Sequence, residues 1–365
     1  MRTGWNAALA AALMLGGASA VCAQQGPKAL EAKAGEAFRH AHSALAFPPT
    51  LAGWPRGRVI GMEQDQLDVA VDYGTIEQGE VFTFYVFRNV SGDVPVWFDR
   101  ARWMIEHRDV LGKAEAGEAG AFVPPGRNEA AGLAASYALS GKGLKSTGVA
   151  VLPLGEWYVK LRASSTTRSP AELMAAMKKA LAELTWPKTL GPAAAAVPVQ
   201  PCSGALSVSG EAKLLAKSKD NQAASMMNAL LGSVAVNAVK DKGEPPPRPP
   251  VWCRDAFQTL QAGAYRPDSA NDSYLLAVSD AGRAISVEPD ATAVLLGLEK
   301  KRKSDKPSYV VQFLLLPQTL TTASYDRMPP PEQAIAIVRE GRFVSGVPSW
   351  GKDKGNINIT MEPGK

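Results

Sequence analysis

The N-terminal leader constrains this chain most, because it directs everything after it into a compartment in which cysteines oxidise. Arg2 precedes an apolar stretch over residues 5–17, which is too short to span a bilayer comfortably. Val21 and Ala23 then occupy the two small-residue positions of an A-x-A-like cleavage site. We therefore predict a signal peptide over residues 1–23, cleavage after Ala23, and a mature chain that is periplasmic or secreted.

Cys22 raises an alternative, because an exported chain with a cysteine near the end of its leader can be acylated there. The residue before such a cysteine is normally Gly, Ala or Ser, whereas this chain has Val21. Release after Ala23 is the better interpretation, although the sequence does not decide whether Cys22 is ever lipidated.

Cleavage leaves two cysteines, Cys202 and Cys253, and an even count in an oxidising compartment favours pairing. We predict that they form a disulfide that closes a loop of about fifty residues and stabilises its domain by about 4 kcal/mol. The alternative is a pair of buried free thiols.

Length and charge exclude some classes of protein. A chain of 365 residues exceeds what one hydrophobic core usually organises, so two domains are expected. The net charge of +5 falls by one when the leader is removed, which is too weak to argue for nucleic acid. No later segment has eighteen uninterrupted apolar residues, so we expect no transmembrane segment after the leader.

Hydrophobic periodicity organises residues 24–187 into an N-terminal α+β domain. Ser169 and Glu172 form a capping box at the start of its last helix. The expected order is a helix at 27–46, strands at 66–73 and 80–88 joined as a hairpin, a helix capped by Asp93, strands near 121–124, 132–139 and 148–162, and a helix at 169–186. This order predicts an antiparallel sheet covered by helices.

Residues 188–201 lack periodicity and contain three prolines, so they are interpreted as a linker. A C-terminal α+β domain with one disulfide follows over residues 202–350, and residues 351–365 are expected to be a mobile tail. The expected elements of this domain are a helix within 211–240, strands at 274–278, 284–287, 292–298 and 309–316, a helix at 331–339 and a strand at 342–347. The predicted fold class is α+β, with two domains that each have an antiparallel sheet and helices packed against it.

Metal and catalytic motifs are missing from the sequence. His40 and His42 are two residues apart on the expected helix, about 200° around it, so we expect no shared metal ion. His107 faces no obvious Ser or Cys motif, and no Ser sits in a G-x-S-x-G elbow. Residues 140–148 mix Gly, Lys, Ser and Thr but lack the spacing of a phosphate loop. We expect no catalytic residue, no metal and no cofactor.

Two surfaces remain as candidates for binding. Trp54, flanked by Gly53 and Pro55 and followed by Arg56 and Arg58, could line a ligand groove on a loop, although packing explains most of the tryptophans.

The basic run is the second candidate, and it consists of Lys300, Lys301, Arg302 and Lys303. It could contact anionic lipid headgroups or acidic polymers, with each charge contributing about 1 kcal/mol at a membrane surface. The structural alternative is a solvated hairpin tip whose charges prevent aggregation.

Residues 47–186 carry a resemblance to a known group of proteins. The segments FPP and GW, the strands DVAVDY and EVFTFYVFR, the segment GEWYVKLRAS and the helix that ends at Trp186 are similar to the first domain of signal-bearing bacterial envelope proteins. Their order of elements resembles the PsbP/Mog1-like α/β sandwich. The resemblance implies that fold and an envelope setting; it carries over no catalytic residue, and fold alone does not fix function.

Two function hypotheses follow. The first is a non-catalytic periplasmic module that binds an envelope protein, an envelope polymer or a small ligand. The alternative is a periplasmic hydrolase whose site is assembled from scattered residues. The sequence leans against an enzyme without deciding the question, and converging carboxylates or a Ser–Lys pair with shifted pKa values would favour the hydrolase.

Overall fold

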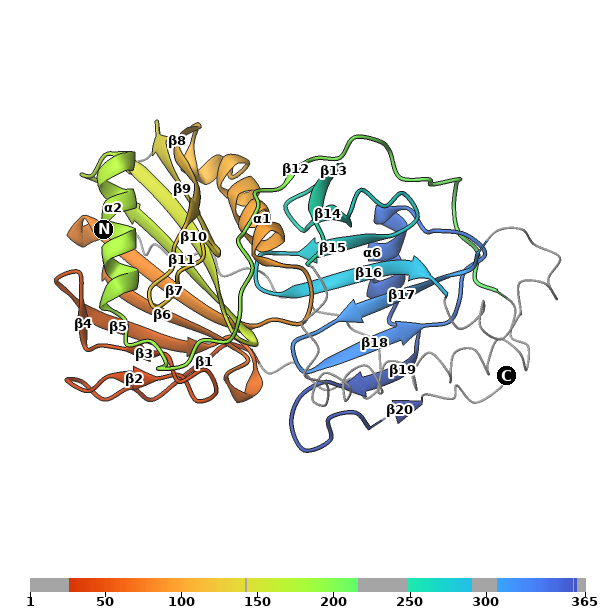
Figure 1. Ribbon diagram of the computed structural model, residues 1–365, viewed down its shortest axis with the longest axis horizontal. Coiled ribbons are helices and arrows are strands. Elements are labelled where there is room, and N and C mark those ends of the chain that lie inside the picture. Colours follow the sequence, from red (N-terminus) through yellow and green to blue (C-terminus); the bar gives the residue numbers. More distant parts are fainter. Residues whose placement is uncertain (1–25, 142, 216–248, 291–306, 357, 360–365) are drawn as a thin grey trace, which may run out of the picture.

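The computed structural model describes residues 26–141, 143–215, 249–290, 307–356 and 358–359. Two nine-stranded sheets lie side by side (Figure 1). All their pairings are antiparallel except one between two strands of the second sheet. The α-helices of the described residues are α1, α2 and α6. The antiparallel sheets predicted for the α+β class are confirmed, but the molecule is richer in strand than the sequence indicated.

The first sheet has the order β1-β5-β6-β7-β11-β10-β9-β8, with β4 paired to β5. Its strands are β1 (Lys28–Ala29), β4 (Thr50–Leu51), β5 (Trp54–Gly61), β6 (Asp68–Thr75), β7 (Glu80–Arg88), β8 (Ala114–Phe122), β9 (Gly132–Leu139), β10 (Ser146–Leu154) and β11 (Trp157–Ser165). A separate ribbon pairs β2 (Phe38–Arg39) with β3 (Ala46–Phe47), and short 3-10 turns are η1 (Gln64–Gln66), η2 (Ile76–Gln78) and η3 (Asp109–Leu111).

The β6–β7 hairpin confirms the strands predicted at 66–73 and 80–88. Alternation places Val69 and Val71 of β6 on the same face as Phe84 of β7, and all three are fully buried. The turn between the strands contains Gly79 in the left-handed region (φ 101°), a conformation that glycine adopts without strain.

One helix packs on each face of the first sheet. Helix α1 (Val94–Glu106) shares a buried cluster with Leu133 of β9, whereas α2 (Pro170–Glu183) shares another with Ala134, the next residue along that strand. Since neighbouring residues of a strand point to opposite faces, the two helices cover opposite sides of the sheet. The capping box of Ser169 and Glu172 at the start of α2 is confirmed.

The helix predicted over residues 27–46 is wrong. Phe38 and Leu45 are buried in the core as their apolar stripe suggested, but the segment is extended and contains β1, β2 and the start of β3. Its backbone bonds to other parts of the chain, with Leu30 N–H donating to the Val59 carbonyl, and it turns back on itself between His40 and Leu45. Tertiary pairing has overridden a helical pattern.

Two further strands differ from their predicted extents. The stretch 148–162 is two strands, β10 and β11, that turn at Gly155, and the strand expected near 121–124 is the longer β8. Strand β5 was missed because Pro55 and Gly57 interrupt its alternation.

The second sheet has the order β12-β13-β14-β15-β16-β17-β18-β19-β20, in which β12 runs parallel to β13. Its elements are β12 (Gln200–Pro201), β13 (Trp252–Gln258), β14 (Ala262–Pro267), β15 (Tyr274–Val278), β16 (Arg283–Pro289), β17 (Tyr309–Leu314), β18 (Gln318–Thr322), β19 (Phe343–Pro348), β20 (Asn358–Ile359) and the helix α6 (Pro331–Glu340), which packs beside β16 and β17.

The strands predicted at 274–278, 284–287 and 309–316 and the helix at 331–339 are confirmed, as is a last strand near 342–347. The helix expected within 211–240 is wrong for its described part, because Leu214 bridges Tyr325 and Leu215 N–H donates to the Ser324 carbonyl in an extended pairing. The rest of that helix and the strand at 292–298 lie outside the described residues. Part of the expected tail pairs with β19 as β20. Mobility of the tail stays a prediction.

The seam between the two sheets is held by buried cations. Lys160 of β11 is 2% exposed, its ammonium lies 3.0 Å from the Asp280 carboxylate, and it donates to the Asp280 carbonyl at 2.8 Å. The same ammonium lies 4.4 Å from the centre of the Tyr85 ring. Asp280 belongs to the turn between β15 and β16. The Lys160 side chain of the first sheet therefore binds a turn of the second sheet through an ion pair and a hydrogen bond.

Two arginines repeat this arrangement. Arg100 of α1 is fully buried and donates to the carbonyls of Ser279 (3.0 Å) and Leu260 (2.9 Å). Arg88 at the end of β7 donates to the carbonyl of Leu316 at 2.6 Å. Each guanidinium thereby satisfies turn carbonyls of the second sheet that would otherwise be buried without a donor.

Apolar packing continues across the seam. Phe87 and Trp97 of the first half belong to the same buried cluster as Tyr265, Leu275 and Ala284 of the second sheet. The two sheets therefore share a core. The domain boundaries at residues 24–187, 188–201 and 202–350 stay a prediction.

Across the described residues, no helix is long and apolar enough to cross a membrane.

The buried Lys160–Asp280 pair predicts a large effect of single substitution. Lys160→Met leaves the Asp280 carboxylate and carbonyl without their Lys160 donor. We expect the free energy of unfolding in urea to fall by about 3 kcal/mol, the lower end for a buried pair, because the Asp280 side chain is 23% exposed. Lys113→Met is the matched control, because Lys113 is 76% exposed in its pair with Glu115 and surface pairs contribute about 0–1 kcal/mol. Equal effects of the two substitutions would contradict the seam described above.

Candidate functional site

A cleft of about 720 Å³ opens at the seam, and we call it the seam cleft. One wall is α1, through Trp103 and His107. The opposite wall is the start of the second sheet, through Cys202, Arg254 and Asp255. The cleft is thus built by both halves of the molecule, and its volume lies in the range of small-ligand sites.

The α1 wall is an ordered aromatic surface. The rings of Trp103 and His107 stack at 4.0 Å, and His107 Nδ1–H donates to the Trp103 carbonyl at 2.9 Å at the end of the helix. Arg100 lies 5.0 Å from the centre of the Trp103 ring. The spacing of i and i+4 on one helix produces the stack.

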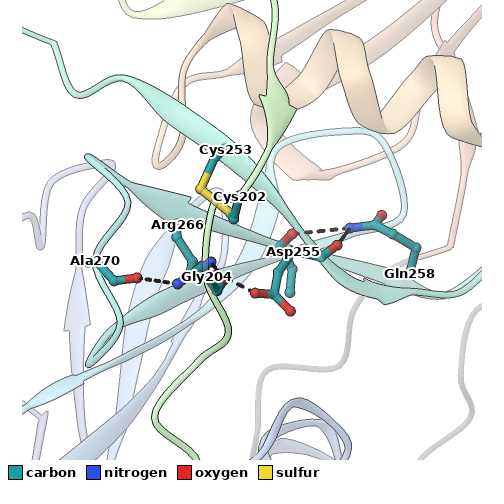
Figure 2. Close-up of a disulfide and its surroundings, with 8 residues drawn as sticks. Cys202, Gly204, Cys253, Asp255, Gln258, Arg266 and Ala270 are labelled. Atoms are coloured by element: carbon teal, nitrogen blue, oxygen red, sulfur yellow. Dashed lines mark hydrogen bonds and ion pairs between the residues drawn. A yellow bond between two sulfur atoms is a disulfide. The ribbon is translucent and has the colours of Figure 1, made fainter.

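The opposite wall is pinned by a covalent bond and a buried arginine (Figure 2). The disulfide Cys202–Cys253 is present, with 4.9 Å between the Cα atoms, which confirms the predicted pairing. Arg266, 1% exposed, donates to the carbonyls of Gly204 and Ala270 and places its Nε 3.2 Å from the Asp255 carboxylate. Gly204 follows Cys202 closely, so the disulfide and Arg266 fix the same short stretch against the sheet.

Arg254 presents charge to the cleft. Its guanidinium lies 2.9 Å from one oxygen of Asp99, whose other oxygen accepts from the Tyr265 hydroxyl at 3.0 Å. Burial raises the pKa of Asp99, and the neighbouring Arg254 opposes that rise. The Arg254 side chain is 32% exposed and lines the cleft, so a ligand in the cleft can contact it.

Lys160 shows the perturbed titration that often marks active sites. Burial lowers its pKa, which the Asp280 carboxylate opposes; burial alone would raise the pKa of Asp280, but Lys160 and Arg162 outweigh it and the pKa is lowered. Lys160 does not line the seam cleft, however, and its ammonium is occupied by Asp280. We therefore assign it to the seam.

Trp54, Arg56 and Arg58 lie on strand β5 rather than on the expected loop. Arg56 is committed to the backbone, donating to the carbonyls of Lys33 (2.8 Å), Glu36 (2.7 Å) and Phe47 (3.1 Å). These bonds tie down the N-terminal segment that covers the sheet.

The other two members of this group also have partners. The Trp54 indole donates to Glu80 at 3.5 Å, and Arg58 pairs with Asp72 at 3.2 Å. The structure keeps the three side chains on one strand, and their role as a ligand surface stays a prediction. The basic run Lys300, Lys301, Arg302 and Lys303 lies outside the described residues, so its contact with anionic surfaces also stays a prediction.

The histidines are arranged differently from the sequence prediction. His40 and His42 are in the turn between β2 and β3, with ring centres 6.0 Å apart, and His107 ends α1. Within the described part of the chain, no three His, Cys, Asp or Glu side chains group as metal ligands. The sequence analysis placed His40 and His42 on a helix, so it missed the hydrogen bonds that both rings make to the carbonyls of Gln66 and Asp65.

Comparison with known proteins adds little. No protein family and no curated protein matches the sequence. A crystal structure from Bacteroides thetaiotaomicron VPI-5482 has a TM-score of 0.20 and 10% identity, covering 69% of this chain and 89% of that one. A similarity that low supports no argument about fold or function.

Removing the disulfide tests how the cleft wall is held. We expect Cys202→Ser with Cys253→Ser to lower the free energy of unfolding by about 4 kcal/mol, because the bond closes a loop across a sequence separation of 51 residues. Reduction of the wild-type protein should produce the same loss in urea unfolding and none in the double variant. A loss below about 1 kcal/mol would show that the remaining contacts alone hold the wall.

Proposed function

We propose that the mature chain is a non-catalytic binding module of the periplasm or of the secreted fraction. Its disulfide supports a compartment in which thiols oxidise, as the leader suggests. In the part of the chain that the structure describes, one α-helix packs on each face of the first sheet, which supports the proposed kinship with PsbP/Mog1-like sandwiches, a fold that serves mainly in binding or assembly.

The observation that carries this proposal is the seam cleft, whose walls come from both halves and are fixed before any ligand arrives. The disulfide, the Arg266 contacts and the pair of Arg254 with Asp99 leave little side-chain freedom to lose on binding. A preorganised cleft of about 720 Å³ suits a small ligand or the end of an envelope polymer or partner protein.

Charge indicates the chemical class of the ligand. Among the residues that line the seam cleft, Arg254 carries a positive charge and is partly exposed, whereas the carboxylate of Asp255 is paired with buried Arg266. With Trp103 and His107 as an aromatic wall, this arrangement favours a ligand that carries an anionic group next to a flat or apolar part.

Benzoate is a minimal probe of that chemistry. We expect benzoate to shift the indole N–H resonance of Trp103 in spectra of protein labelled with ¹⁵N-tryptophan, with a Kd of about 1 mM for a ligand of this size. Arg254→Gln should weaken binding at least about tenfold by removing the charged donor.

Benzylamine is the matched control, because it has the same ring with the opposite charge. The Trp103 resonance is assigned with Trp103→Phe. An equal response to benzylamine, or no response of Trp103 to benzoate, would contradict the proposed ligand class.

A further inference from the structure

The loop of residues 63–68, here called the latch loop, has a strained backbone. Asp65 (φ 52°) and Gln66 (φ 55°) are adjacent residues in the left-handed region, and neither is glycine. Such a pair persists only where surrounding contacts hold it.

Two histidines supply those contacts from the turn between β2 and β3. His40 Nε2–H donates to the Gln66 carbonyl at 2.8 Å, and His42 Nε2–H donates to the Asp65 carbonyl at 2.9 Å. The other ring nitrogen of buried His40, Nδ1, lies 2.8 Å from the Ser43 hydroxyl and accepts from the Ser43 backbone N–H at 3.1 Å. The neutral ring with its proton on Nε2 satisfies all of these contacts.

The latch loop also joins the two sheets. Glu63 lies 2.9 Å and Asp68 3.4 Å from the guanidinium of Arg283 on β16. Asp65 accepts a hydrogen bond from the indole of Trp350, which follows β19. A loop that two histidines hold in a strained shape therefore presents three carboxylates to the second sheet.

Few charges near His40 favour its protonation. His42 is beside it on the same turn, and the Asp65 carboxylate lies 3.4 Å from His42 and is shared with the Trp350 indole. From the packed neighbours, Glu156 precedes Trp157, on whose ring His40 packs at 4.7 Å, and Arg88 lies 5.1 Å from the Trp350 ring.

Protonation of His40 would set two donors against each other. An added proton on Nδ1 would face the Ser43 backbone N–H that this nitrogen now accepts, in a site fully closed to solvent. The Ser43 hydroxyl could accept that proton only by turning its own proton away from Nδ1, while it also accepts from the Leu45 N–H. Burial, followed by repulsion from His42, lowers the pKa of His40 to about 4, which the bond to the Gln66 carbonyl only partly opposes.

We propose that the latch loop is an acid-released connection between the two sheets: protonation of His40 frees residues 63–68, which then release Arg283 and Trp350. The open form exposes His40 to water and so takes up the proton more readily than the closed form. Linkage therefore places release between about pH 4 and about pH 6.5, with the closed form favoured above this window and lost as the pH falls through it. The Lys160–Asp280 pair lies close enough to Asp68 to interact with it electrostatically, but Lys160 contacts Asp280 directly and does not depend on His40, so this pair keeps the sheets joined.

Hydrogen exchange read by mass spectrometry, corrected for intrinsic rates, tests the proposal on the mature protein at pH 7 and pH 5. We expect the peptides that cover residues 63–68 and 349–354 to exchange at least about tenfold faster at pH 5. The peptide that covers residues 279–282, in the turn gripped by Lys160, should keep its protection.

His40→Gln keeps a side-chain donor for the Gln66 carbonyl but cannot be protonated, so its latch peptides should exchange alike at both pH values. His42→Gln is the matched control and should retain the acid response.

Three results would overturn the proposal. They are unchanged exchange of the wild-type latch peptides at pH 5, loss of protection in residues 279–282 together with the latch, which means global acid unfolding, and an acid response of His40→Gln equal to that of the wild type.

Discussion

The structure depends on cations of the first half being buried against turns of the second sheet. Lys160 and Arg100 are buried away from water. The turn of the second sheet supplies their partners: the carboxylate and carbonyl of Asp280 for Lys160, and the carbonyl of Ser279 for Arg100. Burying a charge in this way is tolerated only because these partners are in place. Separating the two halves would therefore remove the hydrogen-bond partners of these buried cations.

Both functional features follow from that constraint. The seam cleft has two walls from different halves, and it keeps its shape because α1, which carries Trp103, also carries the Arg100 that grips the second sheet. The latch loop bridges the same halves through Arg283 and Trp350, at contacts held by neutral histidine instead of a buried cation. The seam thus combines contacts of buried cations, which hold the sheets together, with the latch loop, whose contacts depend on the protonation of His40.

Elements that depend on contacts between residues near each other in the sequence could be predicted from the sequence. The alternation of β6 and β7 and the capping box at Ser169 needed no knowledge of the rest of the chain. The role of Lys160 did need it: alternation along β11 sets Lys160 opposite the core face, where a charge normally meets water, and only the second sheet shows that it is buried. His40 was misplaced for the same reason, since long-range pairing replaced the apparent helix.

The most direct test of the shared seam is native-state hydrogen exchange at low urea, which gives the free energy of opening for each strand. We expect the same value for β7 of the first sheet and β15 of the second in the wild-type protein, because the sheets unfold together. The two strands should have separate values once Lys160→Met and Arg100→Met are combined. Different values for the two strands in the wild-type protein would contradict the claim that buried cations make the sheets one cooperative unit.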